Sequence, residues 1–172
     1  KEQQDLEDNQ LRLNVINKET EAQIKQLIVQ SKKRGLSDEE RIKILERANA
    51  LEVQNFELNK AQFNAELKNA EAVILSKAKI SKAELDLFFS EKSTADQRAE
   101  IQAKVDDYEE EFKRYSDLRI EKADEQGASL VLQEKLQNRL AGVEIDREER
   151  SEKAAAAREK ANEKASAAQQ KA

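Results

Sequence analysis

The sequence has no proline and only three glycines among its 172 residues. Proline interrupts a helix and glycine weakens one, so the backbone has few positions at which it must turn. Cysteine, histidine, tryptophan and methionine are also absent. The lack of cysteine excludes disulfides and thiolate metal sites, and the lack of histidine removes the commonest acid–base side chain. We therefore expect long helices, with no catalytic residue, no metal site and no cofactor.

Large apolar residues are scarce as well. Aromatic residues make up 4% of the chain, charged residues make up 39%, and the mean hydropathy is −0.92. Such a chain has too few large apolar residues for a broad globular core. It has enough of them for a narrow apolar seam with charged outer faces. These proportions predict an all-α fold, in which long helices form an extended coiled coil or an elongated helical bundle.

Charge and hydropathy also narrow the choice of partners. The 31 basic and 36 acidic residues are interleaved and leave a net charge of −5, so no basic patch predicts specific nucleic-acid binding. No apolar run approaches the ~20 residues that a membrane span needs, and no signal peptide is visible. Because residue 1 is lysine, we expect a segment of a longer chain or a processed product.

Two breaks divide the helical pattern. Gly35 follows three basic residues, which favour the end of a helix, and the second break follows the most apolar run of the chain. The predicted order is a helix over 1–34, a break over 35–37, a helix over 38–90, a break over 91–94, a helix over 95–150, and an Ala/Lys/Glu-rich helical tail over 151–172.

Each break ends in a sequence that is typical of a helix start. Ser37 and Glu40 form a capping box, in which each side chain bonds to the backbone amide of the other residue. Thr94 and Gln97 form a second box of the same type. We therefore expect Ser37 and Thr94 to be N-caps.

Apolar residues after the second break recur at steps of three and four, which indicates a heptad seam. The seam residues are Ile101, Val105, Tyr108, Phe112 and Tyr115, followed in the same frame by Leu136, Leu140 and Val143. Polar positions and Gly127 lie between these two groups and predict a loosened stretch or a local turn. Two neighbouring apolar stripes in the 38–90 helix favour three or more helices in contact, from one chain or from several. We expect the seam to mediate self-association into a homo-oligomer.

The tail and the asparagines complete the pattern. From Ser151 onward the chain has no large apolar residue, so it buries too little to fold alone. It is either a thin seam lined by Ala154, Ala157 and Ala161 or a fraying end. Asparagine is frequent in the first two helices, and we expect some of these side chains to set helix register at seam positions.

Two stretches resemble a known family. Residues 11–24 (LRLNVINKETEAQI) and 36–48 (LSDEERIKILERA) resemble recurring patterns in tail tape measure proteins of phages and prophages of Bacteroidetes bacteria. Ala22 and Gln23 stand where that pattern usually has Arg-Glu. The resemblance covers about residues 6–60.

The resemblance implies a structural rod in the lumen of a phage tail, assembled in the bacterial host cytoplasm and in contact with copies of itself and with the tail tube or other virion proteins. It implies that the rod sets tail length and leaves when DNA is ejected. As one continuous helix, 172 residues would span roughly 260 Å. Two alternatives stay open: a cellular coiled-coil scaffold or adaptor, and a compact three-helix binding module that folds back at the two breaks. An enzyme is not expected.

Overall fold

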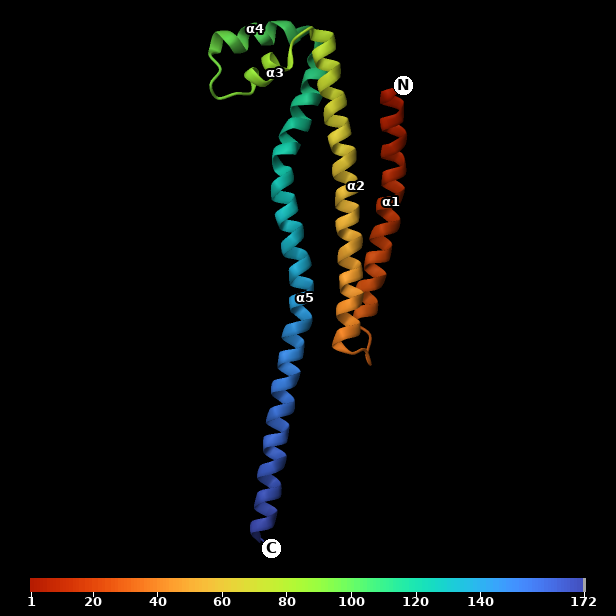
Figure 1. Cartoon of the computed structure of the whole chain (residues 1–172), viewed down its shortest axis with the longest axis vertical. Coiled ribbons are helices and arrows are strands. Elements are labelled where there is room, and N and C mark those ends of the chain that lie inside the picture. The colour runs from red at the N-terminus through yellow and green to blue at the C-terminus, as the bar shows by residue number, and fades with distance from the viewer. Residues whose placement is uncertain (172) are drawn as a thin grey trace. The chain divides into compact units, whose positions relative to one another are not determined.

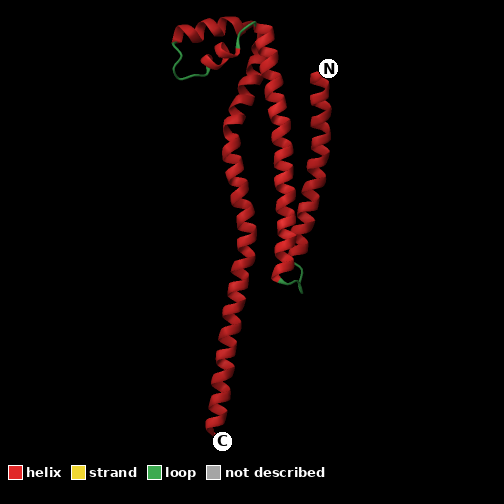
Figure 2. Cartoon of the chain, viewed as in Figure 1, coloured by secondary structure: helices red, strands yellow, loops and turns green. Residues whose placement is uncertain are grey.

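The computed structural model describes residues 1–171, of which 91% are helical and none lies in a strand (Figure 2). The predicted all-α class is confirmed. The helices are α1 (Glu2–Ser31), α2 (Asp38–Ala78), α3 (Lys82–Phe88), α4 (Ala95–Val105) and α5 (Glu109–Lys171), with a short 3-10 helix, η1 (Asp106–Tyr108), between the last two (Figure 1).

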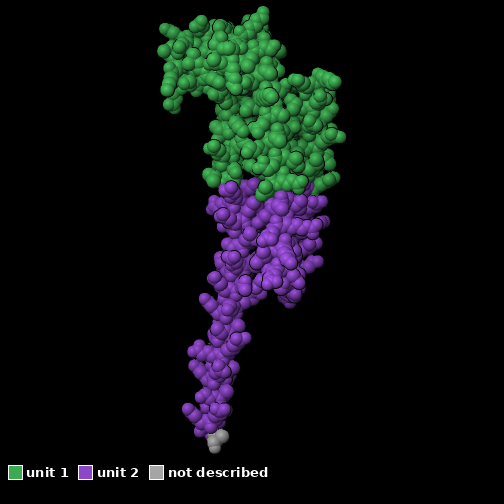
Figure 3. All heavy atoms as spheres, in the orientation of Figure 1, with its two compact units in different colours: residues 1–19, 53–130 green, residues 20–52, 131–172 purple. Residues whose placement is uncertain are grey.

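The chain divides into two compact units (Figure 3). Unit 1 holds residues 1–19 and 53–130, and unit 2 holds residues 20–52 with the chain from Val131 onward. Each of the helices α1, α2 and α5 lies partly in unit 1 and partly in unit 2. Each unit is described by itself below.

Unit 1 is built on antiparallel helices. The Nζ of Lys77 lies 2.7 Å from an oxygen of Glu111, and Lys60 pairs with Glu125 at 3.7 Å. Residue numbers fall along α2 as they rise along α5, so the two helices run in opposite directions. The amide of Gln62 donates to the carbonyl of Leu6 at 3.1 Å and ties α1 to α2.

The core of unit 1 lies where α2 ends and α5 begins. Its buried residues are Ala70, Ile74, Ile80, Leu85, Val105 and Tyr115. Helix α3 supplies Leu85 and α4 supplies Val105, while Tyr108 of the 3-10 helix η1 packs against this core, and we call these three elements the cap. A helix as short as α3 is unstable on its own. It is helical here because its apolar side chains are buried in the shared core.

Unit 2 has a smaller core, which is formed by the last part of α1 and the first part of α2. Ile24 and Leu27 of α1 pack with Ala48 of α2, which has no exposed surface. Helix α5 joins through polar contacts, because the amide of Asn49 donates to the Leu136 carbonyl at 3.3 Å and Arg139 pairs with Glu52.

The structure corrects the predicted helix limits in the first half of the chain. The first helix ends at Ser31 and not at residue 34, and Gly35 has a φ of +87°, which glycine adopts freely. The helix predicted over 38–90 ends at Ala78, because Lys79 takes a left-handed φ of 54°. Ser81 then caps a new helix by accepting a hydrogen bond from the amide of Glu84 at 3.1 Å.

The helix predicted over 95–150 also needs correction. It ends at Val105, the turn η1 redirects the chain, and a second helix starts at Glu109 (Figure 1). Of the loosened stretch or local turn expected around Gly127, the turn is wrong, since α5 passes through that residue without a break and continues to Lys171. One glycine in a long helix costs only about 1 kcal/mol, which the surrounding good helix formers offset.

Candidate interaction surfaces

Both predicted capping boxes are formed. The amide of Glu40 donates to the Ser37 hydroxyl at 3.1 Å, and the amide of Ser37 donates to the Glu40 carboxylate at 3.2 Å. Thr94 and Gln97 exchange the same two bonds at 3.2 and 2.9 Å. These four side chains therefore fix the starts of α2 and α4 and offer no chemistry to a partner.

The predicted self-association seam lies inside unit 1. Ile101, Val105 and Tyr115 are 4%, 0% and 2% exposed, and Tyr108 and Phe112 pack against the same core. These five residues come from α4, η1 and α5, so they do not form one straight stripe. A second copy could reach them only if this core opened, and the structure corrects their role to intrachain packing.

The second part of that seam packs inside unit 2. Val143 is 8% exposed and Leu136 and Leu140 are half-buried. The Leu136 carbonyl accepts from Asn49 of α2, so this face of α5 is turned toward its own chain. The sequence identified the apolar face correctly but could not show which chain covers it.

An aromatic cluster joins the cap to α5. Phe88 meets Phe112 edge-on at 5.2 Å, and Phe89 meets Tyr115 at 6.0 Å. The guanidinium carbon of Arg119 lies 4.6 Å from the Phe89 ring centre, and its Nη1 donates to Asp86 at 3.0 Å and to the Tyr115 hydroxyl at 2.9 Å. Sequence reasoning missed this role of Arg119, although its spacing of four from Tyr115 is a usable signal.

Asparagine side chains link helices at defined levels. Asn17 of α1 and Asn59 of α2 exchange two amide hydrogen bonds, at 3.0 and 3.1 Å. The Lys122 ammonium donates to Asn64 at 2.8 Å, which ties α5 to α2. The expected use of asparagine in setting register matches these contacts, because a shift of either helix would separate the paired amides.

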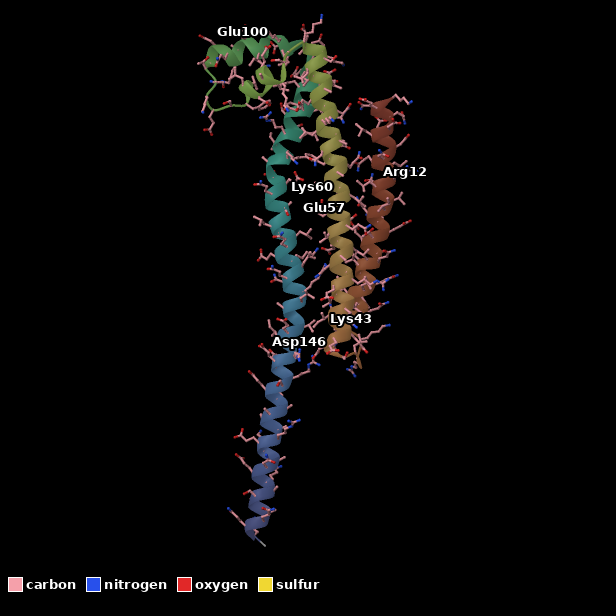
Figure 4. The ribbon with its side chains drawn as sticks, viewed as in Figure 1. Arg12, Lys43, Glu57, Lys60, Glu100 and Asp146 are labelled. Carbon is pink, nitrogen blue, oxygen red and sulfur yellow. The ribbon has the colours of Figure 1, made fainter. Side chains whose placement is uncertain are left out.

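A small groove opens on unit 1 between α2 and α5. It encloses about 210 Å³ and is lined by Phe56, Phe63, Asn59, Lys60, Glu121 and Glu125. The two phenylalanines are only half-buried and belong to neither apolar core. Figure 4 labels Lys60, the charged residue that α2 contributes to this groove. The groove offers apolar surface beside the Glu121 carboxylate, while Glu125 is already paired with Lys60 and Lys122.

A second groove lies in unit 2 and is more basic. It encloses about 470 Å³, with apolar lining from Ile28, Leu45 and Val143 and cationic side chains from Lys32, Arg41 and Arg139. Arg139 is already paired with Glu52. The Nε of Arg41 is buried and has no hydrogen-bond partner.

The last part of α5 is the most exposed surface of the molecule. Every residue from Glu144 to Lys171 is exposed, and we call this stretch the exposed α5 segment. The alanines at 154, 157 and 161, which the sequence left open as a seam or a fraying end, lie in regular helix and are exposed.

Within residues 1–171, no group of three or more acidic side chains is arranged to hold a metal ion. No helix in this range combines the length and the apolar character that crossing a membrane requires.

Comparison with known proteins finds no relative of this chain. No protein family matches this sequence, and neither a curated protein nor a solved structure is similar to it.

Proposed function

We propose that this chain is a structural helical segment of a phage virion, of the tail tape measure kind, with no catalytic role of its own. In this proposal it lies in the tail lumen, contacts copies of itself and tail tube or other virion proteins, contributes to tail length and is released at DNA ejection. The link to a virion rests on the resemblance of residues 11–24 and 36–48 to that family.

The observation that carries the structural role is the series of polar contacts that lock helix register. Asn17 with Asn59 and Lys122 with Asn64 do so in unit 1, and Asn49 with the Leu136 carbonyl does so in unit 2. A chain that must hold fixed dimensions needs such contacts, because a plain apolar seam tolerates slippage. The specialised polar side chains of this protein serve geometry, which supports a mechanical role.

The antiparallel arrangement changes how such a segment would encode length. The longest helix, α5, has 63 residues and therefore a length of about 95 Å, far below the roughly 260 Å of one continuous helix. Removing seven residues from one helix would shift its partners out of register. A deletion that keeps the fold must therefore remove the residues that lie side by side on all helices in contact.

The experiment examines phage particles induced from the source organism. Mass spectrometry of purified tails should detect peptides of this chain, and their absence from tails would overturn the virion role. In the encoding gene, a matched deletion of residues 13–19, 56–62 and 121–127 removes the level of the Asn17–Asn59 pair from three helices. Tails should become shorter while particles still assemble. An unmatched deletion of 121–127 alone should instead abolish assembly.

The groove of Phe56 and Phe63 favours a second function, a scaffold or adaptor that binds a partner helix. Half-buried phenylalanines in an open groove are a usual docking surface for an apolar side chain, and Glu121 would favour a basic neighbour on that ligand, whereas Glu125 is already paired with Lys60 and Lys122. Phe63→Ala should then abolish partner binding while the matched change of exposed Leu58→Ala should not. Intact binding in both variants would rule out this groove.

A further inference from the structure

The groove of unit 2 lies where α1 ends, α2 begins and α5 passes beside both, and we call it the unit 2 groove. Each of these helices contributes one apolar side chain to its lining, namely Ile28, Leu45 and Val143. Its volume of about 470 Å³ falls within the range of roughly 300–1,000 Å³ that is usual for small-molecule sites. The apolar floor favours a ligand with a hydrocarbon part.

Gly142 keeps the α5 side of the unit 2 groove open. A Cβ atom added to this glycine would meet no atom within 4 Å, so a side chain at this position would extend into free space. Glycine costs about 1 kcal/mol relative to alanine inside a helix, and no close contact requires it here. A larger residue at 142 would therefore favour the helix and fill part of the groove.

The charged side chains of the lining leave an excess of positive charge. Arg139 is neutralised by its pair with Glu52. Among residues 1–171, no partner forms an ion pair with Lys32 or Arg41, nor with Asp146, which carries the one carboxylate of the lining. Three cations against the carboxylates of Asp146 and Glu52 leave a net charge of +1. The groove therefore favours an anion.

Arg41 is the cation best placed to meet that anion. Its Nε is buried without a hydrogen-bond partner, so the stem of the side chain packs against the protein while no acceptor holds the guanidinium. The residue as a whole is half-buried, which leaves the outer part of the guanidinium accessible. A carboxylate beside it would gain a charge-assisted hydrogen bond, the stronger kind of hydrogen bond.

We propose that the unit 2 groove binds a small amphiphilic carboxylate, with the chemistry of a medium-chain fatty acid. The hydrocarbon chain of the ligand lies on the apolar floor, and its carboxylate accepts from Arg41 and pairs with Lys32. The negative charge of Asp146 opposes the same anion and lowers its affinity. This inference does not depend on a virion setting, so it fails or holds separately from the proposed function.

Isothermal titration of the whole chain with octanoate tests the site. We expect one site per chain, and a Kd that tightens by up to roughly fourfold for each methylene added from hexanoate to decanoate. Acetate has the anion without the chain, and octylammonium has the chain with the opposite charge. Both should bind about tenfold or more weakly than octanoate. No octanoate binding, or equal affinity for either of these two probes, would overturn the proposal.

Charge variants with effects of opposite sign separate anion binding from a change in folding. Arg41→Gln should weaken octanoate binding about three- to tenfold, whereas Asp146→Asn should tighten it about two- to fivefold. Lys43→Gln removes one positive charge from an exposed position of α2 outside the lining and should change the Kd less than about twofold. Figure 4 labels both Asp146 and Lys43. Unchanged affinity in Arg41→Gln, or weaker binding in Asp146→Asn, would contradict the proposal.

A side chain at position 142 tests the space itself. Gly142→Leu should abolish octanoate binding while the melting temperature does not fall, because leucine favours the helix more than glycine does. Gly127→Leu makes the same change in the same helix, at a glycine whose added Cβ would also meet nothing, and should leave binding unchanged. Circular dichroism checks that each variant is folded. Full octanoate binding by a folded Gly142→Leu chain would show that the ligand lies elsewhere and overturn the proposal.

Discussion

The cap of unit 1 and the exposed α5 segment are equally helical, yet different causes make them so. In the cap, Leu85 and Val105 have no exposed surface and the short helices depend on shared burial. In the exposed α5 segment no side chain is buried, and alanine, glutamate and lysine supply strong intrinsic helix preference. The comparison teaches that helix content in this protein is no measure of packing, so mutations should affect the two regions very differently.

The largest effect is expected in the cap. Leu85→Ala removes a fully buried side chain and should lower the free energy of unfolding by about 2–5 kcal/mol. The matched control, Leu130→Ala on a side chain that is 66% exposed, should change it by no more than about 0.5 kcal/mol. Urea unfolding followed by circular dichroism measures both, and equal losses would refute the role of the cap as a core.

A smaller effect is expected at the paired amides between α1 and α2. Asn17→Ala removes both bonds to Asn59, whose Oδ1 loses its donor while its Nδ2 still donates to the Asn55 carbonyl, and it should cost about 1–2 kcal/mol. Asn9→Ala, an exposed position on the same helix with the same change in helix preference, serves as the control. A double-mutant cycle should show coupling of about 0.5 kcal/mol or more, and additive losses would mean that the two amides do not interact.

Helix caps should come next. Thr94→Ala removes the acceptor for the Gln97 amide and should cost about 1 kcal/mol, with faster hydrogen exchange in the first turn of α4. Ser151→Ala, within α5, should leave exchange at that position nearly unchanged. Unchanged protection after Thr94→Ala would mean that the capping box does not hold the start of α4.

Ion pairs around the cap predict a slight sensitivity to acid. Hydrogen bonds from Lys104 and Lys77 lower the pKa of Glu84 and Glu111, respectively, below their ordinary value of about 4.3. Their contribution is therefore complete above that value and is lost as pH falls through the lowered pKa. NMR titration should show both midpoints shifted downward, and Lys77→Gln should return that of Glu111 toward its ordinary value while leaving Glu84 unaffected.

The smallest effect is expected from removing the exposed α5 segment after Ser151. At high salt and low protein concentration, the truncated chain should unfold within about 0.5 kcal/mol of the full chain, because the deleted residues bury nothing. Helical signal should decrease in proportion to the residues removed. A loss of several kcal/mol would show that the segment is held by its own chain.

Much of this fold could be predicted because its signals are local. Ser37 with Glu40 and Thr94 with Gln97 form helix starts from four neighbouring residues each, and the chemistry needs no other part of the chain. Ser81 and Glu84 carry the same pattern, and recognising it would have located the break after Ala78. Lys79 gives no such signal, since a left-handed lysine is held by its surroundings and not by its own preference.

The candidate surfaces were harder to predict because they depend on which helices meet. The spacing of Val105, Tyr108 and Phe112 shows a shared face, but the same spacing serves a core within one chain and an interface between chains. The turn at η1 decides between them by folding this face onto α2 and α3. Likewise, the pairing of Asn17 with Asn59 follows from helix register, which the sequence of either helix alone does not contain.

The uncovered end of α5 also has a kinetic consequence. Seven lysines and arginines lie from Arg147 to Lys171, all of them exposed, and Arg150 alone among them is paired with another helix, through Asp38. Cleavage there requires only local helix opening, whereas cleavage in the cap must wait for a larger part of unit 1 to unfold. Trypsin should therefore shorten the chain from this end first. The rate of that trimming would report directly on whether anything has covered the segment.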